Sequence, residues 1–111
     1  MRFAVFNNDG TIRYTTNAIE WAEWFENIEN RRIRLTTLTG SPPTREEHTI
    51  STVLVGTDDA LFETLDHANR THKDYTLQGA INTHNILVQA LVNNGSEIMH
   101  TLKKEFRNAA D

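Results

Sequence analysis

Residues 49–56 constrain the fold most, because they form the strongest strand candidate in the chain. They read TISTVLVG, and β-branched residues at most of these positions favour the pleated backbone. The apolar residues fall on both faces, which is typical of a strand that is covered on both sides. We therefore expect this segment to be the central strand of a sheet.

Four further strands are predicted. Residues 3–6 are apolar, and the Asp9-Gly10 turn signal would let the chain reverse into residues 12–14, so we expect an N-terminal hairpin. Residues 31–39 and 60–65 also have strand-like composition and alternation.

Two polar segments are predicted to be connections. Residues 40–47 contain two prolines and are expected to form an exposed loop. Residues 66–74 are polar and turn-like, so we expect no regular structure there.

Three amphipathic helices are predicted, capped by Asn17, Thr76 and Ser96, because each of these side chains can accept an unpaired backbone N–H of a first turn. The second helix is expected to stop at Asn93-Asn94-Gly95, which suits a left-handed cap. Apolar positions and one histidine recur at helical spacing. They are Trp21, Trp24, Phe25 and Ile28 in the first helix, Leu77, Ala80, Ile81, His84, Leu87, Val88 and Leu91 in the second, and Ile98, Met99, Leu102 and Phe106 in the third.

Together these elements predict an α+β protein. We expect a small antiparallel or mixed sheet packed by an N-terminal amphipathic helix and two C-terminal helices. The 111 residues fall in the usual size range of one domain, and no change in composition marks a linker. We therefore expect a single domain over residues 1–111, with a core over residues 1–94 and a C-terminal helical extension over residues 95–111.

Composition excludes several classes of protein. Without cysteine the chain cannot form a zinc ribbon, an iron–sulfur cluster or a thiol nucleophile. Its net charge of −4 argues against nucleic acid as a direct partner, because nucleic-acid-binding domains usually carry an excess of basic residues. No apolar run reaches the roughly 20 residues of a bilayer span, and the start does not have the pattern of a signal peptide. We expect a cytoplasmic protein without a membrane partner.

His84 is the first candidate site residue, because it lies on the apolar side of its predicted helix. The main interpretation is a core histidine whose ring nitrogens bond backbone or hydroxyl groups. The alternative pairs it with Glu63 or Asp58, as an acid–base dyad or a ligand contact. Asp58 follows the central strand and is interpreted as a turn residue, with cation binding as its alternative.

Arg32, Arg34 and the tryptophans Trp21 and Trp24 are the candidate binding residues. The two arginines are expected to share one face of their strand, as a solvated face or as phosphate contacts. The tryptophans are interpreted as core, with a partner or nucleotide site as the alternative if they are left open. No HExxH or HxxxH spacing occurs, so we predict no metal site, and we predict no cofactor and no catalytic residue.

Three blocks in the chain stand in a distinctive order: WAEWFE at residues 21–26, STVLVG at 51–56 with Asp58 after it, and LFETL at 61–65. Tyr75, Ala80 and His84 follow, at the positions of a tyrosine-led helix with a central histidine. This order, over about residues 18–92, resembles a family of short proteins of tailed bacteriophages and prophages, which typically read WAxWFE, STVFLGLDH and LFETM. Asp59 stands where that family usually has histidine. The resemblance implies a phage or prophage origin and a compact α+β fold, and it implies no reaction.

The leading functional hypothesis is a non-catalytic phage-type accessory protein that acts by binding. We expect it to inhibit a host defence or metabolic protein in the cytoplasm of an infected or lysogenic bacterium. One alternative is a small-ligand module that sequesters a nucleotide signal, and another is a small enzyme that uses a histidine–carboxylate pair. The sequence also leaves open whether the protein forms a homo-oligomer.

Overall fold

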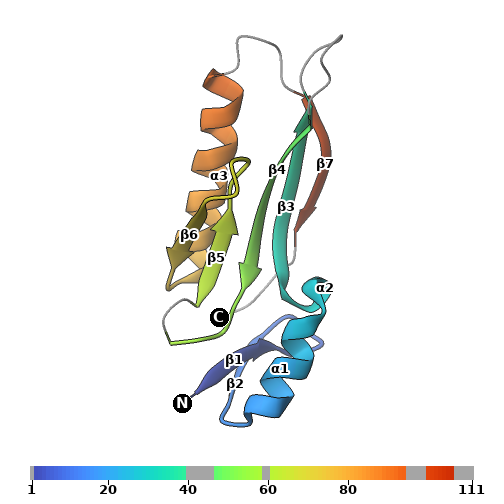
Figure 1. Cartoon of the computed structure of the whole chain (residues 1–111), viewed down its shortest axis with the longest axis vertical. Coiled ribbons are helices and arrows are strands. Elements are labelled where there is room, and N and C mark those ends of the chain that lie inside the picture. Colours follow the sequence, from blue (N-terminus) through green and yellow to red (C-terminus); the bar gives the residue numbers. More distant parts are fainter. Residues whose placement is uncertain (1, 40–46, 59–60, 95–99, 107–111) are drawn as a thin grey trace.

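The structure, a computed structural model, describes residues 2–39, 47–58, 61–94 and 100–106 (Figure 1). Within these residues it contains a two-stranded sheet, a five-stranded sheet and three helices, so the fold is α+β as expected. None of the described helices combines the length and the apolarity that a bilayer crossing needs.

The N-terminal hairpin is present as predicted. β1 (Phe3–Phe6) and β2 (Ile12–Thr15) pair antiparallel, and Gly10 in the turn between them has a φ of 88°. That left-handed conformation is accessible to glycine at little cost, which explains the turn at this position.

Two short helices follow the hairpin. α1 (Ala18–Glu26) is capped by Asn17, whose side-chain oxygen accepts two backbone N–H groups of the first turn at 3.1 Å each. α2 (Ile28–Arg31) is capped in the same way by Asn27. Asn17 therefore has the capping role predicted for it.

The larger sheet is antiparallel throughout. Its strands stand in the order β6-β5-β4-β3-β7, so β4 is central, as the sequence predicts. The strands are β3 (Arg32–Thr39), β4 (Glu47–Leu54), β5 (Phe62–Leu65), β6 (Thr71–Asp74) and β7 (His100–Phe106).

The long helix α3 (Leu77–Asn94) packs on one face of this sheet (Figure 1). Thr76 caps it, because its hydroxyl accepts the amide of Gly79 at 3.0 Å. Under α3 the central strand buries Ile50, Thr52 and Leu54, while the residues between them are half-buried. The helix therefore covers one face of the strands.

One hydrophobic core joins the hairpin to the larger sheet. Trp24, Ile12, Leu61 and Ile81 pack against its rim. Its buried members come from β1, β3, β4, β5 and α3, and they are Ala4, Phe6, Ile33, Leu54, Phe62, Leu77 and Ala80. Burial of apolar surface that is shared across these elements holds the two sheets together.

The predicted C-terminal helical extension is wrong for residues 100–106. These residues form β7, which pairs antiparallel with β3. Short apolar runs fit helix and strand periods almost equally well, and here the second edge of β3 supplies the backbone hydrogen-bond partners that a strand needs. Of the two predicted C-terminal helices, the first is present as α3 and the second is a strand over residues 100–106. Residues 95–99 and 107–111 lie outside the described residues.

Two smaller expectations also differ from the structure. Residues 71–74, predicted as a turn-like connection, form β6 on the edge of β5. The first helix packs mainly on the β1–β2 hairpin rather than across the larger sheet. In the predicted loop, residues 40–46 lie outside the described residues and Glu47 already belongs to β4.

Candidate functional site

His84 is fully buried between α3 and the larger sheet, where both of its ring nitrogens have hydroxyl partners. Nε2 lies 2.8 Å from the hydroxyl of Thr36, and Nδ1 lies 2.8 Å from the hydroxyl of Thr52. The Thr52 hydroxyl also lies 2.8 Å from that of Thr64. A hydroxyl can donate or accept, so this chain of bonds satisfies the imidazole in either neutral tautomer. The geometry is that of a structural histidine.

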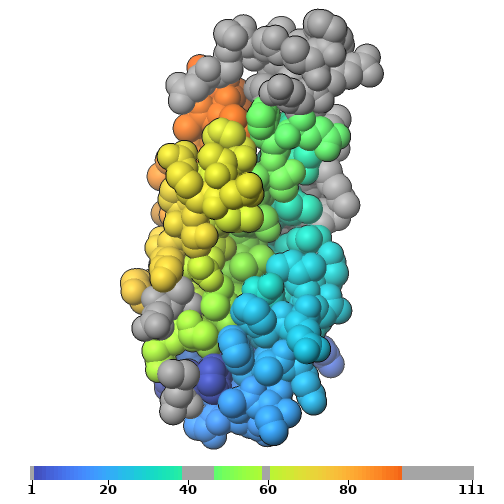
Figure 2. All heavy atoms as spheres, viewed as in Figure 1, coloured from blue at the N-terminus to red at the C-terminus, as the bar shows by residue number. Residues whose placement is uncertain are grey.

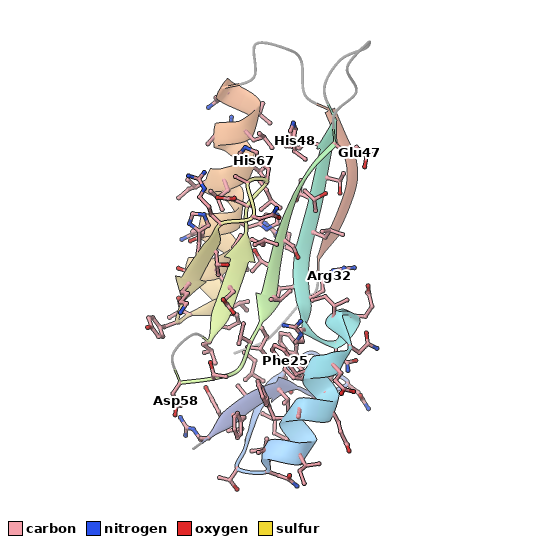
Figure 3. The ribbon with its side chains drawn as sticks, viewed as in Figure 1. Phe25, Arg32, Glu47, His48, Asp58 and His67 are labelled. Carbon is pink, nitrogen blue, oxygen red and sulfur yellow. The ribbon has the colours of Figure 1, made fainter. Side chains whose placement is uncertain are left out.

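The carboxylates proposed as partners of His84 lie elsewhere. Glu63 stands in register with Val53 and Lys73, and its neighbour Thr64 faces α3, so strand alternation puts Glu63 on the opposite face of the sheet. Asp58 is exposed on the connection beyond β4 (Figure 3). The structure therefore does not bring the proposed histidine–carboxylate pair together.

The face of the larger sheet opposite α3 is half-buried to exposed, and we call it the open face. Two rows of residues cross it from strand to strand. One row is Arg32, Val53, Glu63 and Lys73, and the next is Leu35, Ser51, Leu65 and Thr71. The first row is mostly charged, and polar and apolar side chains alternate in the second, a composition that can face water and can also receive a partner.

Arg32 and Arg34 do not share a face, contrary to expectation. The register of β3 against β4 shifts between them, so Arg32 pairs with Val53 on the open face while Arg34 pairs with Thr52 on the α3 side. The Arg34 guanidinium donates to the side-chain oxygen of Asn85 on α3 at 2.7 Å, and Arg32 bonds Glu29 at 2.7 Å. A β-bulge reverses the usual alternation, which explains the separation.

The tryptophans pack against the hairpin. Trp21 stacks on Phe3 with ring centroids 4.8 Å apart, and its indole N–H donates to the carbonyl oxygen of Val55 at 3.0 Å. Trp24 meets Phe6 edge to face at 6.3 Å. Both side chains are half-buried, so the aromatic stripe is mainly a packing surface.

Asp66 organises the turn between β5 and β6. Its buried carboxylate accepts hydrogen bonds from the backbone of Ala68 and Arg70 and from the side chains of Arg70 and His72, at 2.8–3.0 Å. Burial opposes ionisation, but the bonds from His72, Arg70 and Ala68 outweigh it and hold the pKa of Asp66 below its ordinary value. The described residues contain no group of three or more His, Asp or Glu side chains that could hold a metal ion.

A pocket that the sequence did not reveal lies between the hairpin and the larger sheet. It has a volume of about 150 Å³ and is lined by Arg2 and Tyr14 of the hairpin, by Asp58 and Leu61 of the β4–β5 connection, and by Tyr75 before α3. Figure 2 shows the dark blue N-terminal residues beside the yellow-green β4–β5 connection at this end of the molecule. Strand alternation puts Tyr14 on the same face of β2 as Ile12, which packs on the core, and only the fold brings Tyr14 close to Asp58 and Tyr75.

No known protein family, curated protein or solved structure matches this chain. The chemistry of the described surfaces is therefore the basis for a functional interpretation. They offer two places for a partner, which are the open face and the pocket beside Tyr14.

Proposed function

We propose that this protein is a non-catalytic accessory protein of the phage type that acts by binding a host protein through the open face. It acts in the cytoplasm of an infected or lysogenic bacterium and inhibits a defence or metabolic protein there. The observation that supports this proposal is that the long helix α3 packs on the other face of the larger sheet, while the described side chains of the open face are half-buried to exposed.

The state of His84 favours binding over catalysis. A general base must reach a substrate proton, and a nucleophile must be held beside its base. The imidazole of His84 is instead buried between Thr36 and Thr52, and strand alternation puts Glu63 on the other face of the sheet. Binding needs only a surface with a few anchor residues.

The open face provides such anchors. Leu65 is 42% exposed, and Leu35 lies in the same row across the sheet. Arg32 ends the neighbouring row, in which Glu63 and Lys73 stand directly opposite each other. Apolar residues next to charges of both signs suit contact with another protein, because burial of the apolar residues supplies affinity and the charges select the partner.

The proposal is tested by affinity purification from a bacterial host with intact-complex mass spectrometry, followed by titration of the purified target. The activity of the target should fall in proportion to added protein and level off at a fixed molar ratio. Continuing loss of activity at sub-stoichiometric protein would show turnover and contradict the proposal.

The open face is tested with a matched pair of substitutions. Leu65→Lys places a charge on the open face and should abolish the inhibition. Ile86→Lys makes the same kind of change at an aliphatic residue on α3 that is 67% exposed, and it should leave inhibition intact. If both folded variants inhibit like the wild type, the open face is not the binding surface.

A further inference from the structure

We infer that the pocket beside Tyr14 binds a pyrimidine nucleotide, with its phosphate at Arg2 and its ring between the tyrosines and Leu61. This inference goes beyond the proposed function, because it concerns a small ligand and uses none of the residues of the open face.

The aromatic lining is the first argument. The chain has two tyrosines, both line this pocket, and they are 51% and 66% exposed at Tyr14 and Tyr75. They come from β2 and from the connection before α3, which are about sixty residues apart in the sequence. Exposed aromatic rings that converge on one pocket are a stacking surface for a planar ligand, since stacking on a nucleobase contributes roughly 1–3 kcal/mol per base.

Arg2 supplies the cation. Its guanidinium carbon lies 4.2 Å from the centre of the Tyr14 ring, so the planar group is held over the tyrosine. No described carboxylate forms an ion pair with Arg2. A guanidinium that is held flat by an aromatic ring keeps its N–H edge for a phosphate, which it can bind with two parallel hydrogen bonds.

A second hollow adjoins the pocket and shares Arg2 and Tyr14 with it. This hollow is more open, and Thr15 and Thr16 complete its lining. Its place beside Arg2 gives room for a solvated phosphate outside the pocket, while the planar ring lies inside.

The size and polarity of the pocket select the base. A cavity of about 150 Å³ accommodates one six-membered ring. Asp58 brings a carboxylate that, when ionised, only accepts hydrogen bonds, and it has no described ion-pair partner. The exocyclic amino group of cytosine is a donor that a carboxylate can accept from, whereas uracil presents a carbonyl oxygen at the same position. We therefore expect cytidine monophosphate to bind more tightly than uridine monophosphate.

Isothermal titration calorimetry of the full chain with CMP, UMP, AMP and inorganic phosphate tests this inference. CMP should bind at one site per chain, and at least about tenfold more tightly than phosphate alone, since ring stacking adds about 1.4 kcal/mol or more. Phosphate binding as tight as CMP, AMP binding as tight as CMP, or no binding of CMP at millimolar concentration would each overturn the inference.

Substitutions locate the ligand. Arg2→Gln and Tyr75→Ala should each weaken CMP binding about tenfold or more. The first removes the cation that binds the phosphate, and the second removes an aromatic ring that stacks on the base. Arg13→Gln is the matched control, since Arg13 lies on the same hairpin but forms an ion pair with Glu20 outside the pocket. Asp58→Asn should reduce the preference for CMP over UMP, because an amide can donate as well as accept. An unchanged preference in Asp58→Asn, or an equal effect of Arg13→Gln and Arg2→Gln, would contradict the assigned geometry. Neither result depends on Leu65 or on a protein partner.

Discussion

Ala4 and Gly56 are joined backbone to backbone: the amide of Ala4 donates a hydrogen bond of 2.9 Å to the carbonyl oxygen of Gly56. Gly56 has a φ of +81°, and a Cβ at this position would overlap the carbonyl oxygen of Ala4. The contact fixes the N-terminal hairpin to the end of β4, and both residues line the pocket. The position of Arg2 and Tyr14 relative to Asp58 therefore depends on a glycine.

Gly56→Ala should destabilise the protein by on the order of 3 kcal/mol, because it adds a steric clash to an unfavourable backbone conformation. Urea denaturation measures the change. Gly10→Ala is the control, since Gly10 has a similar φ of 88° in the hairpin turn and should cost only about 1–2 kcal/mol. Equal losses of stability in the two variants would show that the close contact between Gly56 and Ala4 adds no cost to a side chain at residue 56.

His84→Leu should cost about 2 kcal/mol in the free energy of unfolding, because it leaves the buried Thr36 hydroxyl without its histidine partner. The bonds of His84 are long-range, to strands 48 and 32 residues earlier in the chain, so the loss should affect the whole sheet. Adding Thr36→Val to His84→Leu should recover part of the stability, since replacing both partners by apolar groups can be nearly neutral. A double variant that is less stable than His84→Leu would contradict this account.

Asp66 should make stability depend on pH in the acid range. Its pKa is lowered in the folded state, so its stabilising contribution is complete above the ordinary aspartate pKa of about 4 and is lost as pH falls further. The difference in Tm between wild type and Asp66→Asn should therefore be largest at neutral pH and shrink below about pH 4. Asp9→Asn, in the exposed turn of the hairpin, is the matched control and should change Tm less. A difference for Asp66→Asn that is constant with pH would contradict the assignment.

Trp21→Ala should destabilise the protein by about 3 kcal/mol, because it removes the ring that packs on Phe3 and leaves a cavity. Trp21→Phe keeps a ring but loses the hydrogen bond to Val55, so it should cost about 1 kcal/mol. Fluorescence of the remaining Trp24 during urea denaturation reports both values. A Trp21→Ala variant with an unchanged transition would show that α1 is not needed to hold the hairpin.

Much of the local structure could be predicted from the sequence. Asp9-Gly10 marks the first hairpin, Asn17 and Thr76 mark the starts of α1 and α3, and the β-branched run at residues 49–56 marks the central strand. Each of these signals spans only a few residues, because turn conformations, capping bonds and side-chain branching act on the nearby backbone.

Part of the functional interpretation could also be anticipated. A histidine on the apolar side of a helix is usually satisfied by neighbouring polar groups, and His84 is held in this way. The identity of its partners could not be predicted, because Thr36 and Thr52 are ordinary strand threonines until the sheet brings them under α3. The separation of Arg32 from Arg34 has a similar origin, since the bulge between them shows only in the pairing of β3 with β4.

The sequence by itself determined the elements whose backbone groups are satisfied locally, namely the hairpin, the capped helices and the position of β4. Only the tertiary structure decided that residues 71–74 and 100–106 are strands, because each is an edge strand that gains its hydrogen bonds from a neighbouring strand. The neighbour of residues 71–74 is β5, across a turn, and the neighbour of residues 100–106 is β3, which is distant in the sequence. The tertiary structure also decided that Arg2, Asp58 and Tyr75 line one pocket. Local signals specify conformation, whereas the convergence of distant side chains depends on how the core joins the hairpin to the sheet.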